Sequence, residues 1–288
     1  MKIAVPVWLL VVLALTVVAL ILILWSVKRR KRPRLALQSG GDLHELIPSI
    51  VGLTQGTLVH GNRVELVQNG AFWDAVFRDI EQARETVNYE TFLSKEGELT
   101  RRMTEILCRK AREGVQVRVM LDGSGGKKFG KKGLNDLCEA GVKVHKYHPI
   151  TWRNLGVLNN RDHRKIMIID GRIGYVGGHC LVDNWLGNAE DKQHFRDISA
   201  RVEGPVVAQL QSAFAENWIE ETGEVPGGEA FFPKLEPQGD MDAHVTWISP
   251  AGSPSSLKLL HYMAIHAAKK RITIQNPYFL PDPDARAS

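Results

Sequence analysis

The chain has 288 residues with 37 Lys and Arg against 32 Asp and Glu, a formal net charge of +5 at pH 7. The excess is local, because residues 1–34 hold seven bases and no acids, which leaves 30 bases against 32 acids in the remainder. A slightly acidic remainder argues against a general nucleic-acid surface, so no nucleic-acid partner is expected. The cysteines, Cys108, Cys138 and Cys180, are widely spaced without a C-x-x-C pair, which argues against a disulfide framework or a zinc site and agrees with a reducing compartment.

The first predicted element is an apolar segment at the N-terminus. Residues Ile3 to Trp25 are apolar apart from Thr16. At about 1.5 Å per residue, a helix of this length crosses a hydrocarbon core of roughly 30 Å, so we expect residues 1–27 to form a transmembrane anchor. A cleaved signal peptide is the alternative, but the apolar run is long and no small-x-small site separates it from the basic residues that follow.

A basic run from Lys28 to Arg34 follows the anchor and contains six bases. By the positive-inside rule it stays on the cytoplasmic side, so we expect a single-pass protein of the inner (cytoplasmic) membrane whose remaining residues face the cytoplasm. The run also suits anionic lipid, although a topology signal alone explains it. Residues 28–63, interrupted by Gly40-Gly41 and Gly52, are interpreted as a basic juxtamembrane linker and a lead-in to the folded part.

An α/β pattern comes next. The apolar periodicity predicts helices over 72–84, 99–113, 133–140 and 205–220, and strands over 86–93, 115–121, 142–146, 165–169 and 173–176. Alternating strands and helices imply a mixed sheet flanked by helices on both faces. We assign residues 64–222 to this first folded half, and residues 223–243, which contain two Pro/Gly-rich turns, to the linker after it.

The segment from Asn160 to Gly171 contains a histidine, a lysine two positions later and an aspartate five positions further on. Side chains at i and i+2 of an extended strand leave the same face, so His163 and Lys165 should point into one site. Both groups suit a phosphodiester, because an imidazole attacks phosphorus or protonates a leaving oxygen while an ammonium neutralises non-bridging oxygens. One motif of this kind makes half of an active site.

The pattern H-x-K-x4-D, followed by Gly177 and Gly178, resembles the signature of the phospholipase D superfamily, and the run from His194 to Pro205 is similar to the corresponding stretch of bacterial cardiolipin synthases. The resemblance implies a phospholipase D-like fold and a phosphatidyltransferase that needs no metal, nucleotide or other cofactor. In such an enzyme one histidine takes the phosphatidyl group from phosphatidylglycerol as a phospho-histidine. Another histidine protonates the departing glycerol, and a second phosphatidylglycerol then displaces the enzyme. Cys180 departs from the pattern, because the family has Asn near that position.

The resemblance also assigns residues to the site. His163, Lys165, Asp170 and Asp197 are the expected catalytic residues, and Asn160, Arg161, Gly177, Gly178 and Glu90 are the expected substrate-binding residues. Asp197 would orient the histidine, whereas Asp170 ends a strand at a Gly turn and suits a supporting role. Glu90 is either a polar wall of the site or a buried carboxylate, and Asn160 and Arg161 either contact phosphate or fix the loop.

A glycine- and lysine-rich loop covers residues 123–132. Its order is not that of a P-loop, which needs Gly-Lys followed by Ser or Thr, so it does not indicate an NTPase. We interpret it as a rim that meets anionic headgroups with Phe129 dipping toward the acyl boundary, or as a solvated loop.

An internal repeat relates residues 83–90 to residues 268–275, an offset of 185. We therefore assign residues 244–288 to a partial second half, in which the repeated segment is expected to form a strand after an amphipathic helix. The offset would place a second copy of His163 at about position 348, beyond Ser288. The expected fold class is thus α/β with one transmembrane helix before it and a truncated second repeat. Two alternatives remain: a phosphodiesterase or nuclease that completes its site as a homodimer, and an inactive membrane-tethered fragment that only binds lipid.

Overall fold

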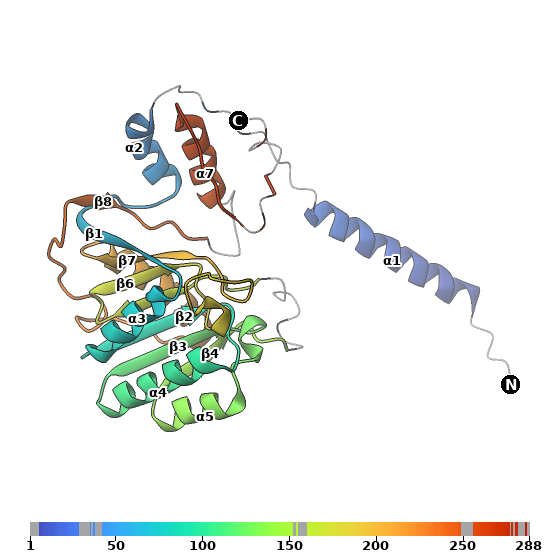
Figure 1. Ribbon diagram of the computed structural model, residues 1–288. Helices are drawn as coiled ribbons and strands as arrows, with labels where there is room; N and C mark the ends of the chain where they lie inside the picture. The colour runs from blue at the N-terminus through green and yellow to red at the C-terminus, as the bar shows by residue number, and fades with distance from the viewer. Residues whose placement is uncertain are drawn as a thin grey trace. The chain divides into compact units, whose positions relative to one another are not determined.

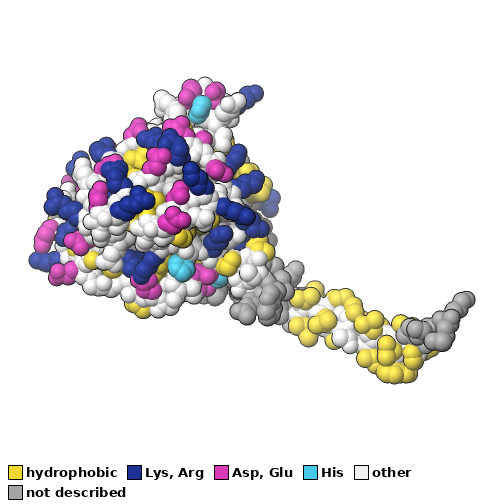
Figure 2. Space-filling view, turned by 90° about the horizontal axis from the view of Figure 1, so that it is seen from below, with side chains coloured by type: hydrophobic (Ala, Val, Ile, Leu, Met, Phe, Trp, Pro, Cys, Tyr) yellow, Lys and Arg dark blue, Asp and Glu magenta, His cyan; other side chains and the backbone are white. Residues whose placement is uncertain are grey.

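The computed structural model describes residues 6–28, 35, 37, 42–151, 154, 160–248, 256–276, 278, 280, 281 and 286. They fall into two compact units, residues 1–45 with 262–288 and residues 46–261. The first unit contains helix α1 (Val7–Lys28), whose apolar side chains are exposed and drawn in yellow in Figure 2. Its segment Val7–Trp25 has a mean hydropathy of 3.3, so α1 is long and apolar enough to cross a membrane.

A signal sequence would meet the same criterion of length and composition as α1. The transmembrane anchor therefore stays a prediction. Residues 29–34 of the basic run lie outside the described residues. The topology predicted from this run therefore also stays a prediction.

The second unit is built on an eight-stranded sheet with the strand order β4-β3-β2-β5-β6-β7-β1-β8. Strands β2, β3 and β4 are parallel to one another, and the other neighbours are antiparallel. This is the mixed sheet that the sequence predicts. The strands are β1 (Val59–Gln68), β2 (Thr86–Thr91), β3 (Gln116–Asp122), β4 (Lys143–Tyr147), β5 (Ile166–Ile169), β6 (Ile173–Gly177), β7 (Ile198–Glu203) and β8 (Met241–Ala243).

Helices cover both faces of this sheet. On one face lie α3 (Ala71–Glu81), α4 (Glu98–Arg112) and α5 (Lys131–Glu139), as Figure 1 shows. On the other face α6 (Val207–Thr222) packs against β2, β4, β5 and β6. The chain also forms α2 (Leu43–Leu53), α7 (Ser256–Ala267) and short 3₁₀ turns at Gly125–Lys127 and Asp183–Trp185.

Strand β5 is covered by helices on both faces, and its sequence, Ile-Met-Ile-Ile, is apolar throughout. Met167 and Ile169 are buried in the cluster beneath α3, α4 and α5, whereas Ile166 and Ile168 are buried beneath α6. A strand covered on both faces needs a continuous apolar run, because successive side chains point to opposite sides. The run between the lysine and the aspartate of the motif is therefore the centre of the sheet.

Helix α4 shows how local sequence positions the layer that covers the sheet. Leu99, Met103 and Leu107 recur at a spacing of four and are almost fully buried. The carboxylate of Asp183 accepts hydrogen bonds from the backbone N–H groups of Glu98 and Leu99, which satisfies two of the free donors at the helix start. A distant loop thereby fixes where α4 begins.

The segment predicted as a linker, residues 223–243, packs against the first half. Glu224 forms ion pairs with Arg118 and Lys143, the Phe231 ring is buried under the Arg118 guanidinium, and β8 pairs with β1. Residues 28–63, predicted as a juxtamembrane linker and a lead-in to the folded part, include α2 and the first part of β1. β7 is likewise absent from the predicted elements. The domain boundaries assigned from the sequence stay predictions.

The predicted second half is only partly regular. The helix expected before the repeated segment forms as α7, but residues 268–276 adopt no regular secondary structure, so the strand expected from the repeat is wrong. A strand is stabilised by pairing its backbone groups with a neighbour, and among the described residues this segment pairs with no strand. The similarity of residues 268–275 to the sequence that leads into β2 does not by itself provide a neighbouring strand.

Candidate active site

The functional side chains gather at one edge of the sheet. The parallel strands β2 and β3 end there, close to Phe92 and Asp122, and antiparallel β5 begins there after residues 160–165. Because β5, β6 and β7 are antiparallel to one another in turn, β6 ends at this same edge at Gly177, and β7 begins there directly after Asp197. The carboxyl ends of parallel strands are the usual place for a ligand crevice in open α/β sheets.

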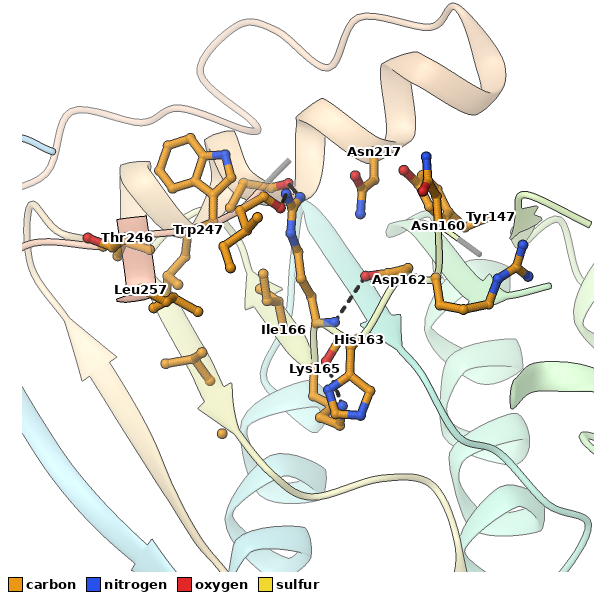
Figure 3. Close-up of a pocket in the computed structure, with 18 residues that line it drawn as sticks. Tyr147, Asn160, Asp162, His163, Lys165, Ile166, Asn217, Thr246, Trp247 and Leu257 are labelled. Carbon is orange, nitrogen blue, oxygen red and sulfur yellow. Dashed lines mark hydrogen bonds between the residues drawn. The ribbon is translucent and has the colours of Figure 1, made fainter. Parts of the chain in front are cut away.

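His163 and Lys165 leave the chain together, as their spacing predicts, and extend away from Trp247 in Figure 3. The exposed His163 ring lies 4.7 Å from the Phe92 ring, and Lys165 Nζ lies 5.3 Å from that same ring. Lys165 Nζ also donates a hydrogen bond to the backbone oxygen of His163 at 2.5 Å. An imidazole and an ammonium are therefore presented to the same space.

The surroundings of the His163 imidazole favour its neutral form. Burial lowers its pKa below the ordinary 6.5, and the Lys165 ammonium lowers it further, while Asp122 opposes both. Burial also lowers the pKa of Lys165, and this is opposed by Cys180 and the carboxylates of Asp162, Asp197 and Asp122. A neutral imidazole beside a cation is the state needed to attack a phosphodiester, because a protonated ring has no free lone pair.

Asp122, which directly follows the predicted strand 115–121, is buried at this edge. Its Oδ1 accepts backbone hydrogen bonds from Ser124 and Gly125, both at 2.8 Å. Its Oδ2 accepts from the N–H of Asp162 at 3.0 Å and lies 3.9 Å from the Arg161 guanidinium. One carboxylate thus ties the end of β3 to the residues just before His163.

Asp197 lies at the same edge, but its hydrogen bonds go elsewhere than to the imidazole. Its Oδ2 accepts from the Trp185 indole N–H at 2.7 Å, and its Oδ1 accepts from the N–H of Ile198. A Cβ at Gly178 would lie 2.5 Å from the Asp197 carboxylate, so a glycine is required there. Asp197 therefore lies next to the site, where its carboxylate opposes the lowering of the Lys165 pKa. Its predicted role in orienting His163 stays a prediction.

Asp170 stands at the opposite end of β5 from His163. The seven steps along the chain from one to the other, at about 3.3 Å each, separate the two by roughly 20 Å. The Asp170 carboxylate accepts hydrogen bonds from the backbone N–H groups of residues 84–86, at 2.8–3.2 Å. The structure does not bring Asp170 into the catalytic edge, because its carboxylate joins the β5 turn to the start of β2.

The sequence of this region matches a known family. Residues 76–218 match the family model described as "Cardiolipin synthase, PLD-like domain". The chain belongs to the phospholipase D-like family. Cardiolipin synthase A of Pseudomonas fluorescens is 35% identical over 223 residues, 77% of this chain and 46% of the relative, and that of Pseudomonas putida matches equally. The chain spans about half the length of these curated relatives.

Solved structures resemble the phospholipase D-like domain with low sequence identity. Nuc from Salmonella typhimurium, a phospholipase D family member, is 11% identical with a TM-score of 0.43, over 56% of this chain and 96% of its own. NucT from Helicobacter pylori is 15% identical with the same TM-score, over 58% of this chain and 99% of its own.

Within the phospholipase D-like domain, Glu90 is not at the surface of the site. Its side chain is fully buried, in keeping with the interpretation as a buried carboxylate, and its predicted contact with substrate stays a prediction. Asn160 and Arg161 are held as parts of the loop: the Asn160 carbonyl bonds the His148 ring at 3.2 Å, and Arg161 donates to the His148 carbonyl at 3.0 Å. Both also line the adjoining cavity.

The cavity beside the motif measures about 550 Å³ and is lined on one side by residues 160–166 and Gly177, on the other by α6 and residues 245–248. Figure 3 shows Trp247, Thr246 and Leu257 facing Ile166 across it. Arg164 links the motif to α6 and to residues 245–248, because its guanidinium donates hydrogen bonds to the carbonyls of Ala213 and Ile248 and to the Glu216 carboxylate. No local sequence pattern points to Arg164, because these partners are distant in the chain.

The chemistry available at this edge is that of imidazole, ammonium and carboxylate groups. Cys180 is buried, and burial raises the pKa of its thiol. Among the described residues, no group of three or more His, Cys, Asp or Glu side chains is placed to hold a metal ion.

Proposed function

We propose that the chain is a membrane-anchored phosphatidyltransferase of the cardiolipin synthase type that acts on phosphatidylglycerol. The observation that carries this proposal is the placement of the His163 imidazole and the Lys165 ammonium side by side at the catalytic edge, both next to the Phe92 ring. The match of this domain to cardiolipin synthases supports a lipid phosphodiester as the substrate.

In the first step His163 attacks the phosphorus of phosphatidylglycerol, forming an N–P bond and breaking the bond between phosphorus and the departing glycerol oxygen. A second imidazole donates the proton which that oxygen takes up. The Lys165 ammonium stabilises the charge that builds on the non-bridging oxygens. A hydroxyl of a second phosphatidylglycerol then attacks phosphorus, gives its proton to the second imidazole, and releases His163 and cardiolipin.

The second imidazole must come from a second motif. The 288 residues contain one His-x-Lys pattern, that of His163 and Lys165. The other histidine of the reaction would be supplied by a second copy of the chain or by a further motif of the same kind. Anchoring by α1 would hold the catalytic edge close to its lipid substrate, as the inner-membrane location predicted from the sequence requires.

Phosphatidyl-p-nitrophenol offers a direct test, because its nitrophenolate leaves without a proton and so removes the need for the second imidazole. The chain in mixed micelles should release nitrophenolate and retain the phosphatidyl group on His163, because this first step needs only one imidazole. His163→Asn should do neither. Cleavage of single-stranded DNA in parallel, with the lipid untouched, would instead favour a nuclease and contradict the proposal.

A further inference from the structure

A buried pair of carboxyl groups lies directly behind His163. Glu90 on β2 is fully buried and Asp162 is 3% exposed, and the two carboxyl groups are direct neighbours that influence each other's pKa. Glu90 Oε1 accepts a hydrogen bond from the Asn217 side chain on α6, and Asp162 Oδ1 accepts from the N–H of Arg164 at 3.0 Å. The remaining oxygens, Glu90 Oε2 and Asp162 Oδ2, have no donor among the described residues.

Two ionised carboxylates cannot satisfy these remaining oxygens, because each would present only lone pairs to the other. Leaving a charged oxygen buried without a donor is strongly unfavourable. One proton between Oε2 and Oδ2 satisfies both atoms and removes the repulsion between like charges. We propose that Glu90 and Asp162 share a single proton and act together as the positioning pair that fixes the backbone of His163.

The link from the pair to His163 is short. The hydrogen bond from Arg164 N–H to Asp162 Oδ1, drawn as a dashed line in Figure 3, spans His163 and closes a turn around it. The N–H of Asp162 is held at the same time by Asp122. Hydrogen bonds thus hold the backbone of Asp162 and Arg164, on either side of His163. Glu90 in turn holds the Asp162 side chain that accepts the bond from Arg164.

The groups facing the pair favour a single retained proton. Burial raises the pKa of Glu90 well above its ordinary 4.5, and Asp162 raises it further, against the opposing Arg164 and Asn217. Burial likewise raises the pKa of Asp162. The titratable or charged groups around them are Arg164 and Lys165 before β5, Asp122 at the end of β3 and Tyr147 at the end of β4, with Glu216 of α6 bound to Arg164.

Infrared spectroscopy of the full chain in detergent tests the shared proton without any assay of activity. At pH 7.5 we expect the carbonyl band of a protonated carboxylic acid, and its loss in Glu90→Gln and in Asp162→Asn. Glu65→Gln, an exposed glutamate on β1, serves as the matched control and should keep the band. Absence of the band in the wild-type chain, or its persistence in both Glu90→Gln and Asp162→Asn, would overturn the proposal.

A second readout follows from linkage. The folded chain keeps a proton that an unfolded Glu90 releases above its ordinary pKa of 4.5, so the free energy of unfolding should fall as pH rises from there toward the raised pKa. In Glu90→Gln an amide N–H takes the place of the proton, and this pH dependence should flatten. An unchanged slope in Glu90→Gln would also contradict a shared proton.

The positioning role rests on the proposed function and is measured with phosphatidyl-p-nitrophenol. Glu90→Ala should lower the rate constant of the nitrophenolate burst at least tenfold with little change in the substrate concentration that gives half of that rate. Glu90→Gln should restore most of the burst rate while removing its decline at alkaline pH. If Glu90→Ala lowered the burst rate no more than Glu65→Gln, the pair would not position His163. Failure of the wild-type chain to react would contradict the proposed function and leave the infrared result standing.

Discussion

At the scale of single residues, the motif divides into two parts with different tasks. His163 and Lys165 carry the chemistry at one edge of the sheet, where burial and a neighbouring cation lower the imidazole pKa. Asp170 holds three backbone N–H groups at the other edge. The same strand therefore joins a reactive end to a structural end, and the two ends should respond differently to substitution.

The pKa of His163 gives the first prediction. We expect a pKa below 6.5 in the wild-type chain and a higher value in Lys165→Gln, because removal of the ammonium relieves its effect on the imidazolium. The His163 Cε1–H signal, followed by NMR as the pH is varied, measures both. Lys234→Gln, at an exposed lysine beside Pro233, which lies against Gly171 at the other end of β5, should leave the value unchanged. A wild-type pKa above 6.5 would show that His163 is not held neutral.

Asp170 gives the second prediction. In Asp170→Asn one acceptor oxygen becomes an amide N–H that faces backbone donors, so the free energy of unfolding should fall by about 1–3 kcal/mol. The exposed Asp240→Asn should change it little. Denaturation in urea measures both variants. The folded Asp170→Asn chain should still react with phosphatidyl-p-nitrophenol at close to the wild-type rate, and loss of reaction without loss of stability would place Asp170 in the chemistry after all.

At the scale of elements, the loop 123–132 shows how context decides a side chain's role. The sequence suggests a rim with Phe129 directed toward lipid, but that ring is 2% exposed and packs in the cluster beneath α3, α4 and α5. The lysines of the loop, Lys127, Lys128, Lys131 and Lys132, are exposed. The interpretation of Phe129 as a lipid contact is wrong, because a phenylalanine in this turn fills the core more favourably than it meets solvent.

Phe129→Ala is the third prediction. Removal of a fully buried ring should lower the free energy of unfolding by about 3–5 kcal/mol. Phe232→Ala, at a ring that is 38% exposed, should lower it by clearly less. Binding of the folded Phe129→Ala chain to phosphatidylglycerol vesicles should equal that of the wild type. Reduced vesicle binding with unchanged stability would restore the lipid-facing interpretation.

Elements with local signals could be predicted from the sequence, and those set by distant partners could not. The helices α3, α4 and α6 and the strands β2 to β6 follow apolar periodicity, and the spacing of His163 and Lys165 fixes their common direction. By contrast, β1 pairs with β7 and with β8, and each of these partners is more than 100 residues away in the chain. Burial of Glu90 and the bonds of Arg164 likewise depend on α6, which no local pattern records.

At the scale of the whole molecule, charge and hydropathy divide the chain into an apolar helix and a folded unit of mixed charge. Basic and acidic side chains are interspersed on the face that Figure 2 shows, in keeping with the nearly balanced charge of the chain after residue 34. Such a surface gives little general attraction for nucleic acid. Attachment to the membrane would then depend on α1.

Membrane topology is the fourth prediction. With α1 spanning the inner membrane and the rest of the chain in the cytoplasm, protease added to right-side-out spheroplasts should leave residues 46–261 intact, whereas protease added to inverted vesicles should digest them. The basic residues that follow α1 are the reason for this orientation. Digestion in spheroplasts would reverse the topology, and recovery of a chain lacking α1 in the periplasm would indicate a cleaved signal.

The central claim is that His163 accepts a phosphatidyl group. Rapid mixing of the chain with phosphatidyl-p-nitrophenol, in the absence of an acceptor lipid, should give a burst of nitrophenolate of about one equivalent per functional site, because the first step needs only one imidazole. Acid-free digestion and mass spectrometry should then find the phosphatidyl adduct on His163, with neither burst nor adduct in His163→Asn. A wild-type chain without a burst, or an adduct on another residue, would contradict the account.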